Sequence, residues 1–187
     1  MKIIEVIFQS VRTGDVSLFS LLIDNIDVNS TNEFSQNMLH EAIAHKQLIF
    51  VDRLLSRKIN VDQKDHKGQT PLHYCAMHNF YDAVFQLIAS GANIFVSDDY
   101  GNEALWTAVF NARGKYDTVK ILVQRGANVN HKNKSNRSPL DFAIQIEDED
   151  MIALLRSQGK WGYPFFPIVT STQVDSQIDV DKASGVH

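Results

Sequence analysis

The sequence lacks a second cysteine and an excess of positive charge. Cys75 is its only cysteine, so no disulfide can form within the chain, and we expect a reducing compartment. The 18 Lys and Arg residues are outnumbered by 22 Asp and Glu residues, and the net charge is −4 at pH 7. Nucleic-acid binding, which requires a basic surface, is therefore not expected.

Long hydrophobic runs are also missing. No stretch approaches the roughly 18 apolar residues that a membrane-spanning helix needs. The apolar run at the N-terminus is interrupted at Glu5 and ends by Gln9, which is too short for a secretory signal. We predict a cytoplasmic protein that does not bind a membrane, while export by a route without an N-terminal signal stays open.

Catalytic signatures are absent as well. The sequence has no His-Glu-x-x-His run, no Gly-x-Ser-x-Gly elbow and no glycine loop that could hold a phosphate. His66 and His78 lie close together in the sequence, but two histidines do not specify a metal site. We predict a protein that is not an enzyme, with no catalytic residues, no metal site and no cofactor. Cys75 is expected to be a packed small side chain.

The main positive feature of the sequence is an internal repeat. Leucines recur at intervals of 33, 33 and 35 residues, at Leu39, Leu72, Leu105 and Leu140. Each leucine lies in a similar block, most clearly at residues 68–76 and 136–143. A fixed period of this length predicts stacked structural units and a protein that acts through an extended surface.

Each unit has the pattern of a turn followed by two short helices. In the second unit, residues 65–68 have turn chemistry, Thr70 suits an N-cap, and Pro71 suits the first helical position. Gly91 is expected to end the second helix in the left-handed conformation. The turns are expected to open at equivalent residues in all four units: Asn32, Asp65, Asp98 and Asn133.

Three segments depart from this pattern. Near the N-terminus, Val6 and Leu21 are expected to lie in register with Leu39 and Leu54, in a capping helix pair near residues 2–11 and 15–24. Two extra residues in the third unit are expected to lengthen the loop around residues 111–114. The acidic run at residues 147–150 is expected to start the last helix, since acidic side chains favour a helix N-terminus.

On these blocks, above all Gly68-Gln69-Thr70-Pro71-Leu72-His73, the sequence resembles the ankyrin repeat family. The resemblance implies an all-α solenoid of about four repeats with an N-terminal capping helix pair, in which short turns or hairpins project beside a concave face. It also implies that His40 and His73 form internal hydrogen bonds, and that this pattern is missing where Trp106 replaces His. The expected boundaries are a repeat domain at 1–159, with a cap at 1–31 and repeats at about 32–64, 65–97, 98–132 and 133–159, and an extension at 160–187.

The extension contains a cluster of aromatic residues next to two prolines, at Trp161, Tyr163, Phe165 and Phe166. Two readings stay open. The aromatic side chains could cover the last repeat, which has no neighbour on one side, or they could form a docking motif for a partner.

The resemblance also implies which side chains face a partner, namely those at the turn tips and on the exposed side of the first helices. Large apolar side chains at such positions are typical binding anchors, and the mixed charges favour one complementary protein over a polyanion. The predicted partner-binding residues are Phe34, Gln36, His66, Lys67, Gln69, Met77, His78, Asp99, Tyr100, Asn102, Phe110, Asn111, Lys134 and Arg137.

These observations predict a non-enzymatic protein-binding module that is a monomer when free. The chain resembles the small ankyrin proteins that bacteria use as immunity proteins, and this implies a protein that binds a secreted toxin and covers its active site. The alternative is a scaffold or effector that recruits a host or regulatory protein. A third hypothesis is an enzyme accessory domain.

Overall fold

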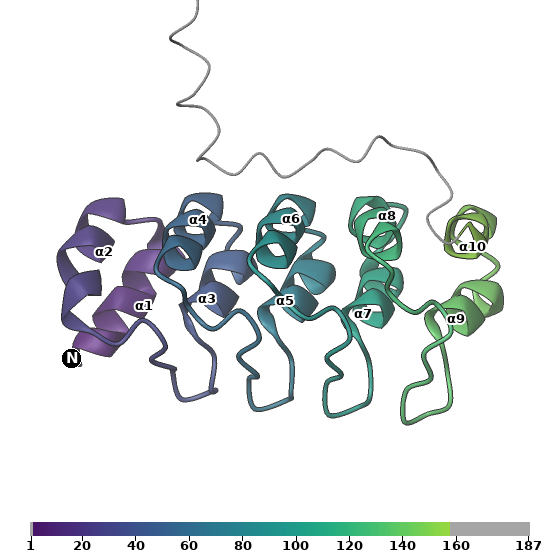
Figure 1. Cartoon of the computed structure of the whole chain (residues 1–187), viewed down its shortest axis with the longest axis horizontal. Coiled ribbons are helices and arrows are strands. Elements are labelled where there is room, and N and C mark those ends of the chain that lie inside the picture. The colour runs from purple at the N-terminus through teal and green to yellow at the C-terminus, as the bar shows by residue number, and fades with distance from the viewer. Residues whose placement is uncertain (1, 158–187) are drawn as a thin grey trace, which may run out of the picture.

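The computed structural model describes residues 2–157, in which five helix pairs stand side by side in a single row (Figure 1). The first helices of the pairs form one layer, the second helices form another, and the loops between pairs project beyond the first layer. The predicted all-α solenoid is therefore confirmed. The helices are α1 (Ile3–Thr13), α2 (Val16–Leu22), η1 (Ile23–Asn25), α3 (Met38–Ala44), α4 (Leu48–Ser56), α5 (Pro71–His78), α6 (Tyr81–Ala89), α7 (Ala104–Asn111), α8 (Asp117–Gln124), α9 (Pro139–Gln145) and α10 (Glu149–Arg156).

The helix ends follow the predicted local signals. Helix α5 begins with Thr70 as N-cap and Pro71 at the first helical position. Helix α6 ends at Ala89, two residues before Gly91, which has a left-handed φ of +93°. Asp148 caps α10 by accepting a hydrogen bond from the backbone N–H of Met151 at 3.0 Å. These short helices thus take their ends from side chains next to them in the sequence.

Each projecting loop, called a hairpin below, is closed by its first residue. Asp65 Oδ1 accepts hydrogen bonds from the backbone N–H groups of Lys67 (2.8 Å) and Gln69 (2.9 Å). The equivalent side chains of Asn32, Asp98 and Asn133 accept the same two bonds in their own hairpins. The hairpins therefore have one shape, which allows them to stack.

Backbone hydrogen bonds and a shared apolar core hold the units together. The N–H of His66 donates to the Phe34 carbonyl at 3.0 Å, and the N–H of Asp99 donates to the Lys67 carbonyl at 3.0 Å. Leu72 in α5 is buried, as are its counterparts Leu39 and Leu105, whereas Leu140 in the last described repeat is half-buried. Each unit thus buries apolar surface chiefly against its neighbours.

The predicted register of the cap is wrong. Leu21 has 71% of its surface exposed, whereas Phe19 is completely buried. Ile7, and not Val6, is the fully buried residue that corresponds to Leu39. The first residues of α2 and α3 are 22 positions apart, whereas the first residues of α4 and α5 are 23 positions apart, so the cap columns are spaced by 32 residues instead of 33.

The extra residues of the third unit lie where the sequence predicts them. The loop between α7 and α8 covers residues 112–116, whereas α5 and α6 are separated by residues 79–80 alone. The insertion leaves α7 packed against both α5 and α9. The aromatic cluster at 161–166, for which the sequence leaves two readings open, lies outside the described residues.

Substituting two glycines should separate the cost of a left-handed φ from the cost of a hairpin contact. In Gly68→Ala, the new Cβ would lie 2.7 Å from Asp99 Oδ1 and 2.9 Å from Asp99 N, at a φ of +73°. In Gly91→Ala, φ is +93° but no atom lies within 4 Å of the new Cβ. We expect both changes to cost about 1 kcal/mol from φ, and Gly68→Ala to cost about 1–3 kcal/mol more from overpacking. Urea unfolding measures the free energy of unfolding of both variants. An equal loss in the two variants would contradict the close contact between residue 68 and Asp99.

Candidate functional site

The first helices and the hairpins together form one surface, called the hairpin face below. It carries two depressions, and the larger one, the N-terminal groove, has a volume of about 1000 Å³. Four predicted partner-binding residues line it: Phe34, Gln36, His66 and Lys67. Its other walls come from α1, from the first hairpin and from the facing sides of α3 and α5.

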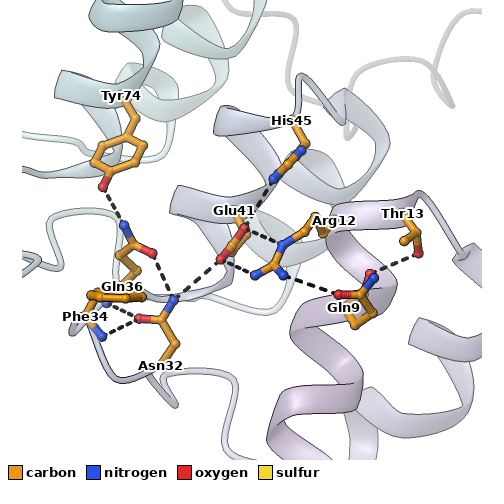
Figure 2. A network of polar contacts seen from close by, with 9 residues as sticks. All are labelled: Gln9, Arg12, Thr13, Asn32, Phe34, Gln36, Glu41, His45 and Tyr74. Carbon is orange, nitrogen blue, oxygen red and sulfur yellow. Dashed lines mark hydrogen bonds and ion pairs between the residues drawn. The ribbon is translucent and has the colours of Figure 1, made fainter.

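A network of polar side chains lies along the floor of the N-terminal groove (Figure 2). Arg12 donates two hydrogen bonds to the carboxylate of Glu41, from Nη2 at 2.9 Å and from Nε at 3.3 Å. This pairing raises the pKa of Arg12, and Glu41 is largely buried. The guanidinium of Arg12 thus balances the charge of the Glu41 carboxylate, and both groups belong to this chain.

The network continues to the second unit through Tyr74. Gln36 Nε2 donates to the Tyr74 hydroxyl at 2.6 Å, and this hydroxyl donates to Asp65 Oδ2 at 2.9 Å. Burial, together with the neighbouring Asp65, raises the pKa of Tyr74 well above its ordinary value. The carboxylate of Asp65 is therefore occupied on both oxygens, since Oδ1 already closes its hairpin.

The second depression, called the aromatic pocket below, has a volume of about 320 Å³ and lies between the second and third units. Six predicted partner-binding residues line it: Gln69, Met77, Tyr100, Asn102, Phe110 and Asn111. Three residues that the sequence analysis did not select complete its walls, namely Asp98, Trp106 and Thr107. The predicted set therefore includes six of the nine residues that line this pocket and omits Trp106, the largest side chain among them.

Trp106 lines the pocket and does not form the hydrogen bond to the next hairpin that a histidine forms at this position in the first two units. In the first two units, His40 Nε2 lies 3.2 Å from the carbonyl of Gln69, and His73 Nε2 lies 3.0 Å from that of Asn102. These bonds confirm the structural role predicted for both histidines. Trp106 occupies the same position in α7, and its ring lies 5.6 Å from that of Phe142 in α9.

A different histidine supplies a bond between the third and fourth units. His131 Nε2 lies 3.0 Å from the Gly101 carbonyl, and His131 Nδ1 lies 3.3 Å from Glu103 Oε1. Glu103 replaces the Thr70 of the second unit, and burial raises the pKa of its carboxyl group. The chain therefore compensates for Trp106 with a residue from the next connecting loop.

The remaining predicted residues line neither depression: His78, Asp99, Lys134 and Arg137. His78 is half-buried beside the ring of Tyr74, and burial lowers its pKa. Asp99 and Lys134 contribute their backbone N–H groups to bonds between hairpins. The missed residues Glu41, Tyr74 and Thr107 share one column at intervals of 33, and this column faces the first residue of each hairpin.

Within residues 2–157, His, Cys, Asp and Glu side chains form no group of three or more that could hold a metal ion. Cys75 is fully buried, as expected of a packed side chain, and burial raises the pKa of its thiol. None of the helices in this part of the chain has the length and apolar character needed to cross a bilayer.

Comparison with known proteins gives a consistent result. A family model described as ankyrin repeats (3 copies) matches residues 7–98 and 80–161. The chain is 26% identical to potassium channel AKT2/3 of Arabidopsis thaliana (73% of this chain, 20% of that protein) and 29% identical to mouse inversin (86% and 14%). It is 24% identical to ankyrin repeat protein nuc-2 of Neurospora crassa (80% and 14%). The chain thus spans a fifth or less of the length of these relatives.

Proposed function

This chain belongs to the ankyrin repeat family, and from this premise we propose that it binds another protein through its hairpin face, which corresponds to the concave face implied by the resemblance, without chemistry of its own. Repeats of this family are protein-interaction modules. The hairpin face is a continuous surface built from all the units, as an extended recognition surface requires.

The aromatic pocket is the observation that carries this proposal. Tyr100 is 64% exposed and Phe110 is 59% exposed, and both rings stand at the pocket together with Met77. Phe110 contacts Phe142 at a ring distance of 5.3 Å, but both Tyr100 and Phe110 keep more than half of their surface exposed, so this apolar surface is available to a partner. Burial of such aromatic side chains in an interface commonly provides its strongest contacts.

Truncating these two rings should weaken partner binding and leave the fold intact. We expect Tyr100→Ala and Phe110→Ala each to cost at least about 1 kcal/mol of binding free energy, because each removes an anchor from the interface. Calorimetric titration with the partner measures the loss. Phe95→Ala is the matched control, since Phe95 is 55% exposed and lines neither depression. Unchanged affinity in both pocket variants would place the interface elsewhere.

We further propose that the partner is a secreted toxin and that the hairpin face covers its active site. This rests on the resemblance of the sequence to small ankyrin immunity proteins, and on the fact that occlusion requires a surface and no reacting group. The names of the relatives given above do not refer to toxins. Recruitment of a host or regulatory protein remains the alternative.

The product of the neighbouring gene provides the test of the toxin proposal. If that gene encodes a secreted toxin, co-expression of this chain should protect cells from it, and Tyr100→Ala with Phe110→Ala should abolish the protection. A neighbouring gene without a toxin, or toxicity that this chain does not reduce, would favour recruitment instead.

A further inference from the structure

Two equivalent aspartates differ in what their second carboxylate oxygen contacts. Asp65 and Asp98 each use Oδ1 to close a hairpin, and Asp65 Oδ2 accepts a hydrogen bond from the Tyr74 hydroxyl. The residue equivalent to Tyr74 in the third unit is Thr107, which makes no bond to Asp98. Within the described residues, the one side-chain donor to Asp98 Oδ2 is Asn102 Nδ2, at a long 3.4 Å.

Asp98 is thus a nearly buried carboxylate without a cation. It is 7% exposed, it lines the aromatic pocket, and no Lys, Arg or His of residues 2–157 forms an ion pair with it. A buried carboxylate is costly when it is unpaired, so this position favours a positive charge supplied from outside. The adjacent Asp99 carries a second, exposed carboxylate on the same hairpin.

The other walls of the pocket also suit a cation. The rings of Tyr100, Trp106 and Phe110 line the same pocket as Asp98, and the latter two rings also lie 5.6 and 5.3 Å from the ring of Phe142 in α9. Aromatic faces attract ammonium and guanidinium groups, and their apolar area packs against the methylene groups of a lysine or arginine stem. A pocket of about 320 Å³ has room for one such side chain.

In the N-terminal part of the chain, an arginine of the chain itself supplies the positive charge at the corresponding place between two units. There, Arg12 on α1 pairs with Glu41 on α3, which is the residue equivalent to Thr107. With the one-residue offset of the cap, the position equivalent to Arg12 in the second unit is Met77. The aromatic pocket therefore has a carboxylate but lacks an arginine like the one that the cap provides to Glu41.

We propose that the aromatic pocket binds a side-chain cation of the partner, a lysine ammonium or an arginine guanidinium, with Asp98 as its counter-ion. This inference rests on the proposed protein-binding function and specifies its chemistry. The partner inserts one basic side chain between the second and third hairpins, where the charge meets Asp98 Oδ2 and the stem lies against the aromatic rings.

Short glycine peptides with one central side chain test the proposal by NMR on the full chain. Peptides with a central lysine or arginine should produce saturable shifts of the Trp106 indole N–H and the Thr107 amide, and the tighter of the two identifies the preferred cation. A norleucine peptide, which has a similar stem without the charge, should bind at least about tenfold more weakly.

Two matched variants separate the charge from the fold. Asp98→Asn should weaken binding of the basic peptide at least about tenfold, whereas Asp65→Asn should leave it unchanged because Tyr74 already covers that carboxylate. Both variants should fold, since Asn32 and Asn133 close their own hairpins with an asparagine. Equal binding of the norleucine and lysine peptides, or no effect of Asp98→Asn, would overturn the proposal.

These outcomes differ from a failure of the proposed function. If Tyr100→Ala and Phe110→Ala weaken binding of the whole partner while Asp98→Asn does not, the interface is correct and the cation is wrong. If the basic peptides bind but the aromatic variants leave partner affinity unchanged, the interface assignment fails and the partner does not insert a cation here.

Discussion

Leu72→Ala is expected to lower the free energy of unfolding by about 2–5 kcal/mol, as for other buried leucines. Leu72 is 1% exposed and lies in α5, which packs against α3 on one side and α7 on the other. Truncation leaves a cavity in the middle of the row, and both neighbouring interfaces lose contacts. Urea unfolding followed by circular dichroism measures the loss.

Leu140→Ala provides the matched control for this prediction. Leu140 occupies the equivalent position in α9 but is half-buried, so the same truncation removes less buried surface. We expect a smaller loss than for Leu72→Ala. If the two variants lose equal stability, or if Leu72→Ala loses almost none, the equivalent leucines of the repeats do not have the packing roles described above.

Lowering the pH from 7 to 4 is expected to cost about 3 kcal/mol of stability through His40 alone. Burial lowers the pKa of His40 from 6.5 to about 4, because the charged ring would lose its hydration. Nδ1 accepts a hydrogen bond from the Asn37 N–H at 3.2 Å, so the neutral ring with its proton on Nε2 fits the site. Between pH 6.5 and 4 the unfolded chain therefore binds more protons than the folded chain.

The sign of the pH dependence follows from this depressed pKa. The contribution of His40 is fully present above pH 6.5 and is lost as the pH falls toward about 4. Burial also lowers the pKa of His73, which adds a loss in the same direction. Urea unfolding at several pH values measures the slope, and NMR titration reports each histidine directly.

His40→Gln separates this effect from the general effect of acid. The variant should be less stable at pH 7, because it loses a buried side chain that links two units, but its stability should fall less between pH 6.5 and 4. A slope equal to that of the wild-type protein would show that His40 does not titrate as its burial implies.

Much of the fold could be predicted because its signals are local. Thr70 and Pro71 start a helix through contacts within their own turn, and Asp65 closes its hairpin through bonds to residues two and four positions later. The cap register could not be predicted in this way. It depends on the distance from the start of α2 to the start of α3, which is one residue less than the distance from α4 to α5, and no motif in the sequence marks that difference.

The candidate site was predicted less completely, since several of its features depend on more than one unit. The places of Tyr100 on its hairpin and of Phe110 on α7 follow from the repeat pattern alone. The sequence shows Trp106 as a departure, but its place in the pocket and its contact with Phe142 come from residues of neighbouring units. Thr107 matters only through comparison with Tyr74, whose contact with Asp65 the sequence does not display.

Periodicity and capping residues thus establish the helices, the hairpins and the order of the units, because these depend on neighbours within one repeat. The packing of one repeat on the next is what leaves Asp98 without a cation and places three aromatic rings in the same pocket. Such an arrangement requires side chains from separate units, and their distances are set by the stacking of the whole row.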